Sequence, residues 1–297
     1  MTGSILGIGE LLWDLFPTGR VAGGAPFNFA FHANQAGYQG IPVSRVGRDE
    51  PGETLLGILN DRGLDTSLIQ VDNLHPTGSV GIELVGGSPR YTIHQDVAWD
   101  HLAWSPQMES IAGRARGLCF GTLAQRHPES RATIQRLVRE AGTAGAICVL
   151  DVNIRQHYFT KEILDKSISI ARWVKLSGED WPHFAAALGL HPAQRDLELK
   201  SLRQRMELEV VAFTDGGEGA ILYTPEGALS IPPLRVDVSD TVGAGDAFTA
   251  GLLASRLRGL CWERSGRYAA ALAAEVVKRP GGAPVIPPEI LAGLAKI

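Results

Sequence analysis

Apolar and polar positions alternate in two different ways along the chain. From about residue 100 onward, short apolar runs of strand length alternate with longer segments of helical periodicity. The strand-length runs are 117–120, 146–151, 173–176 and 210–214, and the helical segments are 128–140, 161–170, 182–188, 245–257 and 263–277. This alternation predicts parallel βαβ units. The runs 221–224 and 229–231 instead predict a hairpin, which would add antiparallel strands at one edge of the sheet.

The first hundred residues follow another pattern. The runs 5–16, 80–84 and 91–94 are strand-like, but glycine- and proline-rich turns such as Gly86-Gly87-Ser88-Pro89 join them. A small β structure, formed from about 10–25 and 77–97 and projecting from the main sheet, would explain this pattern; a plain hairpin at the edge of the main sheet is the alternative. The chain has no internal repeat or low-complexity tract, and we expect residues 1–297 to form one α/β domain.

Composition narrows the functional classes. A chain of 297 residues with 44% hydrophobic residues can bury one large core, and a net charge of −4 argues against nucleic-acid binding. Cys119, Cys148 and Cys261 lack paired spacing and have mostly apolar neighbours, which favours buried free thiols over disulfides or a zinc site. No signal peptide and no apolar run of roughly 20 residues is found, so we expect a cytoplasmic protein with no membrane contact.

The most informative segment is Asp240-Thr241-Val242-Gly243-Ala244-Gly245-Asp246-Ala247-Phe248, which places a carboxylate directly after a glycine-rich turn that opens a helix. Gly243 and Gly245 permit backbone angles with which successive N–H groups converge on an anion at the positive end of the helix dipole. A carboxylate beside a phosphate is repulsive unless it takes a proton from an attacking hydroxyl, which predicts that role for Asp246. An ordinary helix start with an acidic first turn is the alternative.

Two N-terminal motifs carry groups suited to binding hydroxyls. Asp14 follows the apolar run 5–13, and its two oxygens can accept hydrogen bonds from two ligand hydroxyls; a buried structural Asp is the competing interpretation. Gly23 and Gly24 allow close backbone approach, and Asn28 at the start of a helix can donate and accept. A simple loop before a proline at a helix start would explain the same motif.

The run 240–248, followed by Phe248-Thr249-Ala250-Gly251, resembles the C-terminal motif of the PfkB family of carbohydrate kinases, which have the ribokinase-like fold. Further segments resemble the family's motifs in the family's order. They are Gly7-Ile8-Gly9-Glu10-Leu11-Leu12-Trp13-Asp14, Gly23-Gly24-Ala25-Pro26-Phe27-Asn28, Val46-Gly47-Arg48-Asp49-Glu50-Pro51-Gly52, Asp151-Val152-Asn153-Ile154-Arg155, Lys175-Leu176-Ser177-Gly178-Glu179-Asp180 and Thr214-Asp215-Gly216-Gly217-Glu218-Gly219.

The resemblance implies a mostly parallel sheet between two helical layers, with the small β structure as a lid that can also pair with a second subunit. It implies transfer of the ATP γ-phosphoryl group to a primary sugar hydroxyl. The proton acceptor would be Asp246, and Gly243, Ala244 and Gly245 would donate N–H groups to the moving phosphate. Asp14, Gly23, Gly24, Asn28 and Arg155 would bind the sugar.

The resemblance also implies a nucleotide and metal site. Lys175, Thr214, Gly216 and Gly219 would bind the nucleotide, Asp180 or Glu179 would hold Mg²⁺ through water, and Asp240 is a candidate for a monovalent cation such as K⁺. Taken alone, Ser177-x-x-Asp180 is also a helix-capping box, 214–219 an ordinary hairpin turn, and Arg155 a surface ion-pair residue.

Two departures bear on specificity. Ala270 stands where several family members place an Asn near adenine, and Gly121-Thr122-Leu123-Ala124 replaces the Glu typical of ribokinases, which favours a fructokinase-like hexose. Fructose is therefore the first hypothesis, 2-keto-3-deoxygluconate or a nucleoside the alternatives, and a catalytically silent sugar sensor a different class. A dinucleotide enzyme is excluded because position 12 is Leu rather than Gly, and no Walker loop is present.

Overall fold

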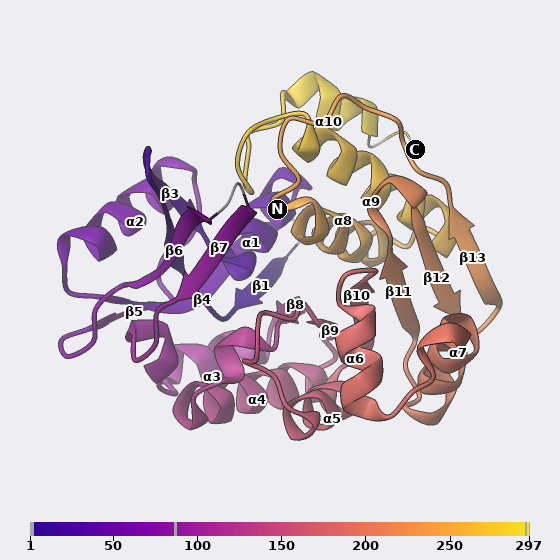
Figure 1. The fold of residues 1–297 in the computed structure, drawn as a ribbon, viewed down its shortest axis with the longest axis horizontal. Helices are drawn as coiled ribbons and strands as arrows, with labels where there is room; N and C mark the ends of the chain where they lie inside the picture. Colours follow the sequence, from indigo (N-terminus) through magenta and orange to yellow (C-terminus); the bar gives the residue numbers. More distant parts are fainter. Residues whose placement is uncertain (1–2, 86–87, 295, 297) are drawn as a thin grey trace.

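The computed structural model describes residues 3–85, 88–294 and 296, so Gly86 and Gly87 of the predicted turn lie outside the described residues. Its main sheet has nine strands in the order β13-β12-β11-β10-β9-β8-β1-β4-β5 (Figure 1). All neighbours pair in parallel except β11–β12 and β12–β13, which form the predicted antiparallel edge. The strands are β1 (Ser4–Ile8), β4 (Gln39–Gly47), β5 (Ile69–Asp72), β8 (Ala115–Phe120), β9 (Ile147–Asp151), β10 (Trp173–Ser177), β11 (Val210–Thr214), β12 (Ala220–Thr224) and β13 (Gly227–Ile231).

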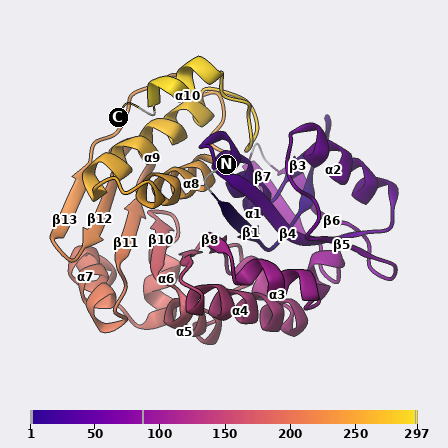
Figure 2. The same cartoon turned by 180° about the vertical axis from the view of Figure 1, so that it is seen from behind.

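Helices cover both faces of this sheet, as the alternating pattern predicted. Helices α1, α8 and α9 lie on one face, and α3 to α7 lie on the other (Figures 1 and 2). The helices are α1 (Ala25–Gln35), α2 (Glu50–Asp61), α3 (Pro106–Ala112), α4 (Pro128–Thr143), α5 (Lys161–Ile170), α6 (Trp181–Leu188), α7 (Arg195–Arg205), α8 (Ala244–Leu257), α9 (Trp262–Val277) and α10 (Pro288–Leu294), with short 3-10 turns η1 (Ala98–His101), η2 (Leu123–Gln125), η3 (Pro192–Gln194) and η4 (Gly216–Glu218).

The central strands are apolar on both faces because each face is buried under helices. Successive side chains point to opposite sides of a strand. In β1, Leu6 packs in the core with Leu164 of α5, whereas Ile5 packs in the other core with Phe29 of α1 and Phe248 of α8. This double burial explains why these strands appear in the sequence as continuous apolar runs rather than as alternating ones.

A second, four-stranded sheet has the order β3-β2-β6-β7 and contains β2 (Leu12–Phe16), β3 (Gly19–Gly23), β6 (Gly78–Val85) and β7 (Ser88–Ile93). The interpretation of run 5–16 as one strand was wrong, because β1 ends at Ile8 and β2 begins at Leu12 in the other sheet. Gly9 has φ 146°, a backbone conformation that favours glycine, and lets the chain leave the main sheet there.

The motif at 46–52 ties the two sheets together. Asp49 caps α2 by accepting a hydrogen bond from Gly52 N at 2.9 Å, and its other carboxylate oxygen accepts one from Thr77 N at 2.8 Å. The Thr77 hydroxyl accepts a hydrogen bond from Gly47 N at 2.9 Å. Since Thr77 immediately precedes β6, this network fixes the entry into the second sheet against the end of β4.

Two of the three cysteines are buried as predicted, but Cys261 is exposed. Its apolar neighbours misled the sequence interpretation, because Cys261 is the residue before α9, where the chain turns at the surface. Among the residues described, no helix combines the length and the apolar character that crossing a bilayer requires.

Candidate active site

Most predicted site residues gather at one edge of the main sheet, just beyond the carboxyl ends of its parallel strands. Arg155 follows β9, Asp180 follows β10, and Thr214 ends β11; Glu10, which the sequence analysis did not single out, follows β1. Helix α8 begins at Ala244 and carries Asp246 in its first turn. Ligands of open parallel sheets bind at this edge, because the strand-to-helix loops converge there.

The turn before α8 has the predicted left-handed conformation at Gly243, whereas Gly245 already lies within the helix. Gly243 has φ 78°, and a Cβ at this position would lie 2.1 Å from the carbonyl oxygen of Gly282, so only glycine fits. Ala244 N donates to Thr241 O at 3.3 Å, and Ala247 N makes the first α-helical bond, to Gly243 O at 2.9 Å. The N–H groups of Gly245 and Asp246 therefore lie ahead of the helical ladder, where an anion can accept from them.

Asp246 is partly buried and is held by Asn28 of α1. Asn28 Nδ2 donates to Asp246 Oδ2 at 2.8 Å. Asn28 Oδ1 is buried and has no hydrogen-bond partner among the described residues, which suits a ligand hydroxyl that donates to it. Burial and the nearby charge of Asp151 raise the pKa of Asp246 to about 6, against the lowering effect of Asn28 and Lys175.

A buried ion pair lies behind the glycine turn. Lys175 Nζ is 3.1 Å from Asp151 Oδ1, and the two side chains are 8% and 6% exposed. Thr249 of α8 donates to Asp151 Oδ2 at 3.2 Å, and a Cβ on Gly245 would lie 2.8 Å from Lys175 Nζ. Burial opposes the ammonium form, but the charges of Asp151, Asp180 and Asp246 raise the pKa of Lys175. The positive charge thus stays behind the N-terminus of α8.

This burial revises the expected position of Lys175. The sequence placed it among the groups that contact the nucleotide, but the side chain points from β10 into the interior and is paired with Asp151. Lys175 therefore packs behind the glycine turn, with its ammonium group next to Gly245.

Asp14 lies inside β2 of the second sheet, so the prediction that it follows a strand of the main sheet was wrong. It still lies beside the predicted sugar-binding glycines, because β2 pairs with β3 and a Cβ on Gly23 would be 2.5 Å from Asp14 Oδ2. Burial raises the pKa of Asp14 to about 6, against the opposing charge of Arg155. Gly24 caps α1 with φ 116°, and a Cβ there would be 2.4 Å from Glu10 O.

Arg155 is exposed and stands opposite the site's carboxylates. Its charge lowers the pKa values of Glu10, Asp14 and Asp246, although burial raises each of them more. The loop that carries Arg155 also reaches the second sheet, since Gln156 Nε2 donates to Tyr91 O at 2.8 Å. Arg155 is therefore placed between the two sheets.

Glu10 is a buried carboxyl that the sequence analysis did not single out. It is only 5% exposed, and burial raises its pKa to about 7, with a further contribution from the charge of Asp246. Its position directly after Gly9, in a motif already recognised, could have drawn attention to it. An acidic residue in a loop is usually expected to be exposed, and the sequence does not show that this one is buried.

The segment Pro280-Gly281-Gly282-Ala283-Pro284 was also missed. His32 Nε2 lies 2.9 Å from Gly282 O, and a Cβ on Gly282 would be 2.6 Å from Asn28 Nδ2. This segment, which lies near the C-terminus of the chain, therefore packs against Asn28 beside its hydrogen bond to Asp246. Its available signal was the tetrapeptide Gly-Gly-Ala-Pro, which also occurs at 23–26 in the other glycine motif.

The three candidate metal residues differ in how many hydrogen bonds their carboxylates already accept from the protein. Asp180 is buried and accepts from Ile154 N at 2.7 Å, Ser177 N at 2.9 Å and Ser177 Oγ at 2.7 Å. Glu179 beside it is exposed. Asp240 accepts from Val242 N at 3.0 Å and Gly281 N at 2.9 Å, so it joins the two glycine-containing loops.

The predicted nucleotide turn is a tight loop between β11 and β12. Asp215 N donates to Gly219 O at 2.8 Å, and Gly216 and Gly219 have φ 48° and 93°. The glycines are needed for the turn itself, and they leave its backbone open to a ligand.

A model of the pfkB family carbohydrate kinases matches residues 15–289. The chain belongs to the pfkB carbohydrate kinase family. An uncharacterized sugar kinase of Pyrococcus horikoshii is 30% identical over 94% of this chain and 91% of its own. The fructokinase of Rhizobium leguminosarum bv. trifolii is 31% identical over 84% of this chain and 79% of its own. The structure of Xylella fastidiosa fructokinase with bound ATP, 23% identical, superposes with a TM-score of 0.85 over 100% of this chain and 99% of its own.

These findings confirm the predicted family and its ribokinase-like fold. As a pfkB kinase, the protein is a phosphotransferase with an alcohol group as acceptor. Its pfkB relatives differ in substrate, since the aminoimidazole riboside kinase of Salmonella typhimurium is 25% identical over 87% of this chain and 82% of its own. The structure of Vibrio cholerae fructokinase, with fructose, ADP and potassium ion, has a TM-score of 0.80 at 21% identity over 99% of this chain and 98% of its own. The acceptor sugar is thus not fixed by the family.

Proposed function

We propose that the protein transfers the γ-phosphoryl group of ATP to a primary hydroxyl of a small sugar, and that Asp246 accepts the hydroxyl proton. The observation that carries this proposal is the Asn28–Asp246 hydrogen bond of 2.8 Å at the N-terminus of α8. It holds one carboxylate oxygen in place beside the N–H groups of Gly245 and Asp246. A carboxylate with a pKa of about 6 is deprotonated at neutral pH and remains basic enough to take a proton.

Charge stabilisation in this proposal comes from the α8 terminus and the groups behind it. The N–H groups of Gly245 and Asp246 face the position of the moving phosphate, and the Lys175 ammonium lies directly behind them. Because the transition state of phosphoryl transfer is loose, positioning and charge stabilisation matter more than the strength of the base. Arg155, exposed opposite the carboxylates, would hold a phosphate or sugar oxygen.

The acceptor would bind between the second sheet and α1. Asp14 and Asn28 Oδ1 would accept hydrogen bonds from its hydroxyls, and Gly23 and Gly24 would let it approach the backbone. Fructose is the best-supported acceptor because Gly121-Thr122 follows β8 in place of an acidic residue, and because a fructokinase is among the relatives above 30% identity. The 25% identical aminoimidazole riboside kinase supports a nucleoside as the alternative. An acid such as 2-keto-3-deoxygluconate ranks lower, because its carboxylate would need cationic partners and, among the described residues, Arg155 is the one near the proposed sugar position. Arg90 was the other candidate, but its side chain lies outside the described residues.

The nucleotide would lie along Thr214, Gly216 and Gly219, and Mg²⁺ bound to its phosphates would neutralise charge there. Glu179 suits a water-mediated contact to Mg²⁺ because its carboxylate is exposed, whereas Asp180 is engaged in holding Ile154 and Ser177. Asp240 is our candidate for organising a K⁺ site, since it joins the 240–243 and 280–284 loops and a fructokinase neighbour contains potassium ion.

A direct assay tests the proposal. ADP formation and phosphosugar formation would be measured with fructose, ribose, 2-keto-3-deoxygluconate and aminoimidazole riboside, with Mg²⁺ and with or without K⁺. Turnover should be fastest with fructose and should require Mg²⁺. Fastest turnover of a nucleoside would move the assignment to that class, and absence of turnover on every acceptor would favour the silent sugar sensor.

A further inference from the structure

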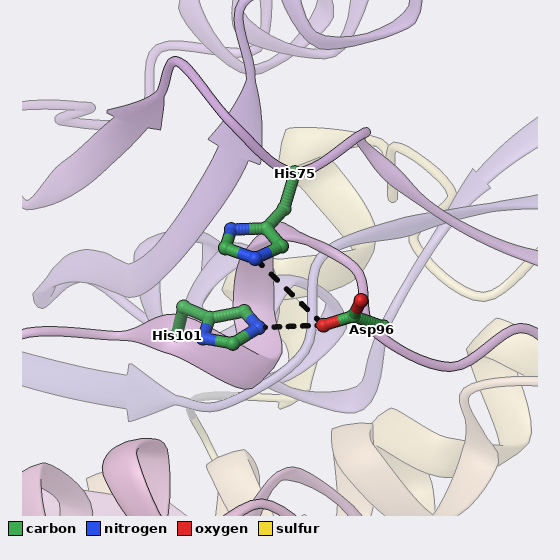
Figure 3. Close-up of side chains that lie close together, drawn as sticks. All are labelled: His75, Asp96 and His101. Atoms are coloured by element: carbon green, nitrogen blue, oxygen red, sulfur yellow. Dashed lines mark hydrogen bonds and ion pairs between the residues drawn. The ribbon is translucent and has the colours of Figure 1, made fainter.

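A cluster of histidines and carboxylates lies where the hairpin β6–β7 joins the main sheet (Figure 3). His75 lies in the segment between β5 and β6, and Asp96 lies in the segment between β7 and η1. His101 ends η1. These three residues, which we term the hinge cluster, are separate from the residues of the proposed phosphoryl-transfer site.

The ligand atoms of the hinge cluster lie close together, although the rings of His75 and His101 are stacked, with centroids 3.6 Å apart and an interplanar angle of 11°. Stacked rings direct their Nε2 lone pairs along parallel lines, so one ring would turn when an ion binds. His101 Nε2 is 3.0 Å and His75 Nε2 is 3.7 Å from the same oxygen, Asp96 Oδ1. All three ligand atoms lie within 4.8 Å of one another. In tetrahedral zinc sites, bonds of about 2.0–2.1 Å separate neighbouring ligand atoms by roughly 3.3–3.4 Å, a value between the two distances observed.

Each imidazole is oriented by a second carboxylate on its other nitrogen. Asp72 Oδ2 is 3.0 Å from His75 Nδ1, and Glu129 Oε2 is 3.0 Å from His101 Nδ1. Carboxylates in this position fix the ring orientation and tautomer of metal-binding histidines and raise their basicity. The arrangement occurs twice here, and it directs both Nε2 atoms toward Asp96 (Figure 3).

Charge and access also favour a cation. Asp72, Asp96 and Glu129 bring three carboxylates, and Arg45, 2.9 Å from Asp72, offsets one of them. The Asp96 side chain is 79% exposed, which gives an ion a path from solvent, whereas His101 is 14% exposed and held firmly. His127 lies beside the cluster with its ring 4.5 Å from that of His101, and its buried Nδ1 has no hydrogen-bond partner among the described residues.

We propose that the hinge cluster binds a divalent transition-metal ion of the zinc type through His75, His101 and Asp96, with water in the fourth position. Imidazole nitrogen with one carboxylate is a donor set for zinc rather than for magnesium, which prefers oxygen. The ion would link the two segments through which β6–β7 is attached, and so restrain the second sheet relative to the main sheet.

The test uses the full chain, stripped with a chelator and titrated with Co²⁺ in saturating Mg²⁺, which occupies oxygen-ligand sites. One equivalent of Co²⁺ should give the visible absorption of a tetrahedral ion, and Zn²⁺ should displace it. Hydrogen exchange over residues 73–83 and 91–97 should slow when Zn²⁺ is bound. Absence of saturable binding by the wild-type chain would overturn the proposal.

Variants locate the site. Asp96→Asn should weaken Co²⁺ binding at least tenfold; Asn suits the backbone of Asp96, which has φ 55°. His101→Gln should do the same, and Glu129→Gln, which removes only the orienting carboxylate, should weaken binding by roughly 10–100-fold. His191→Gln removes an exposed histidine outside the cluster and should bind as the wild type does. If His101→Gln fails to fold, Asp96→Asn decides, and wild-type affinity in that variant would overturn the assignment.

Discussion

At the scale of single residues, the proposed chemistry depends on Asp246. Replacing Asp246 by Asn keeps the shape of the side chain and removes the proton acceptor. We expect kcat to fall by roughly 10²–10⁴, an activation barrier about 3–5 kcal/mol higher, with little change in KM. Steady-state kinetics with the best acceptor would measure this, with the exposed Asp237→Asn as the matched control. An Asp246→Asn enzyme within tenfold of the wild type would refute the assigned role.

The same carboxylate predicts a pH dependence. Asp246 accepts a proton only when it is deprotonated, and its pKa is about 6, so kcat/KM should fall as the pH is lowered through 6. Asp14 also has a pKa of about 6, and burial is the main cause for both groups. A pH profile of the Asp14→Asn variant distinguishes the two carboxylates. If Asp246 causes the fall in kcat/KM below pH 6, that fall should persist in the variant.

Glu10 should reduce the stability of the folded protein at neutral pH. Its pKa rises from 4.5 to about 7 on folding, so between these values the folded state binds a proton that the unfolded state has lost, and stability falls as pH rises. Above pH 7 the ionisation of Glu10 lowers the free energy of unfolding by roughly 3 kcal/mol, because each pKa unit corresponds to about 1.4 kcal/mol.

Glu10→Gln cannot ionise, so we expect it to be more stable than the wild type at pH 8 and to match it near pH 4. Urea unfolding at both pH values measures the difference. Glu179→Gln, at an exposed site, should show no such difference between the two pH values. Equal stability of wild type and Glu10→Gln at pH 8 would contradict the prediction.

At the scale of elements, the Lys175–Asp151–Thr249 cluster connects β10, β9 and α8 behind the glycine turn that opens α8. Lys175→Met leaves the buried Asp151 carboxylate without its partner, and we expect a loss of about 3–5 kcal/mol in unfolding free energy. The double variant Lys175→Met/Asp151→Leu removes both charges and should lose less than the sum of the single variants. Additive losses in urea unfolding would show that the two side chains do not interact energetically.

At the scale of the whole molecule, the second sheet exposes apolar side chains on the face that also carries Asp14. Phe16, Val21 and Tyr91 are 41%, 45% and 53% exposed on β2, β3 and β7. We propose that this surface pairs with a second copy of the chain, because exposed apolar strands favour association. Sedimentation should show a dimer for the wild type and a monomer for Phe16→Glu, whereas Leu197→Glu, at an exposed leucine of α7, should leave the dimer intact. A monomeric wild-type chain would contradict this arrangement.

The sequence alone determined the layered α/β fold and the glycine turn at Gly243, because both depend on local patterns. Parallel strands buried on both faces leave continuous apolar runs, and a left-handed residue packed against another backbone leaves a glycine, as at Gly243. Only the tertiary structure could decide which side chains meet. It separated run 5–16 into strands of two sheets at Gly9, buried Lys175 against Asp151, and brought Gly282 onto Asn28 across the whole chain. It also gathered His75, Asp96 and His101, which have no motif spacing. Burial in the folded chain raises the pKa of Glu10, and long-range contacts decide which charged groups lie near one another. Neither burial nor long-range contact can be inferred from the residues adjacent in the sequence.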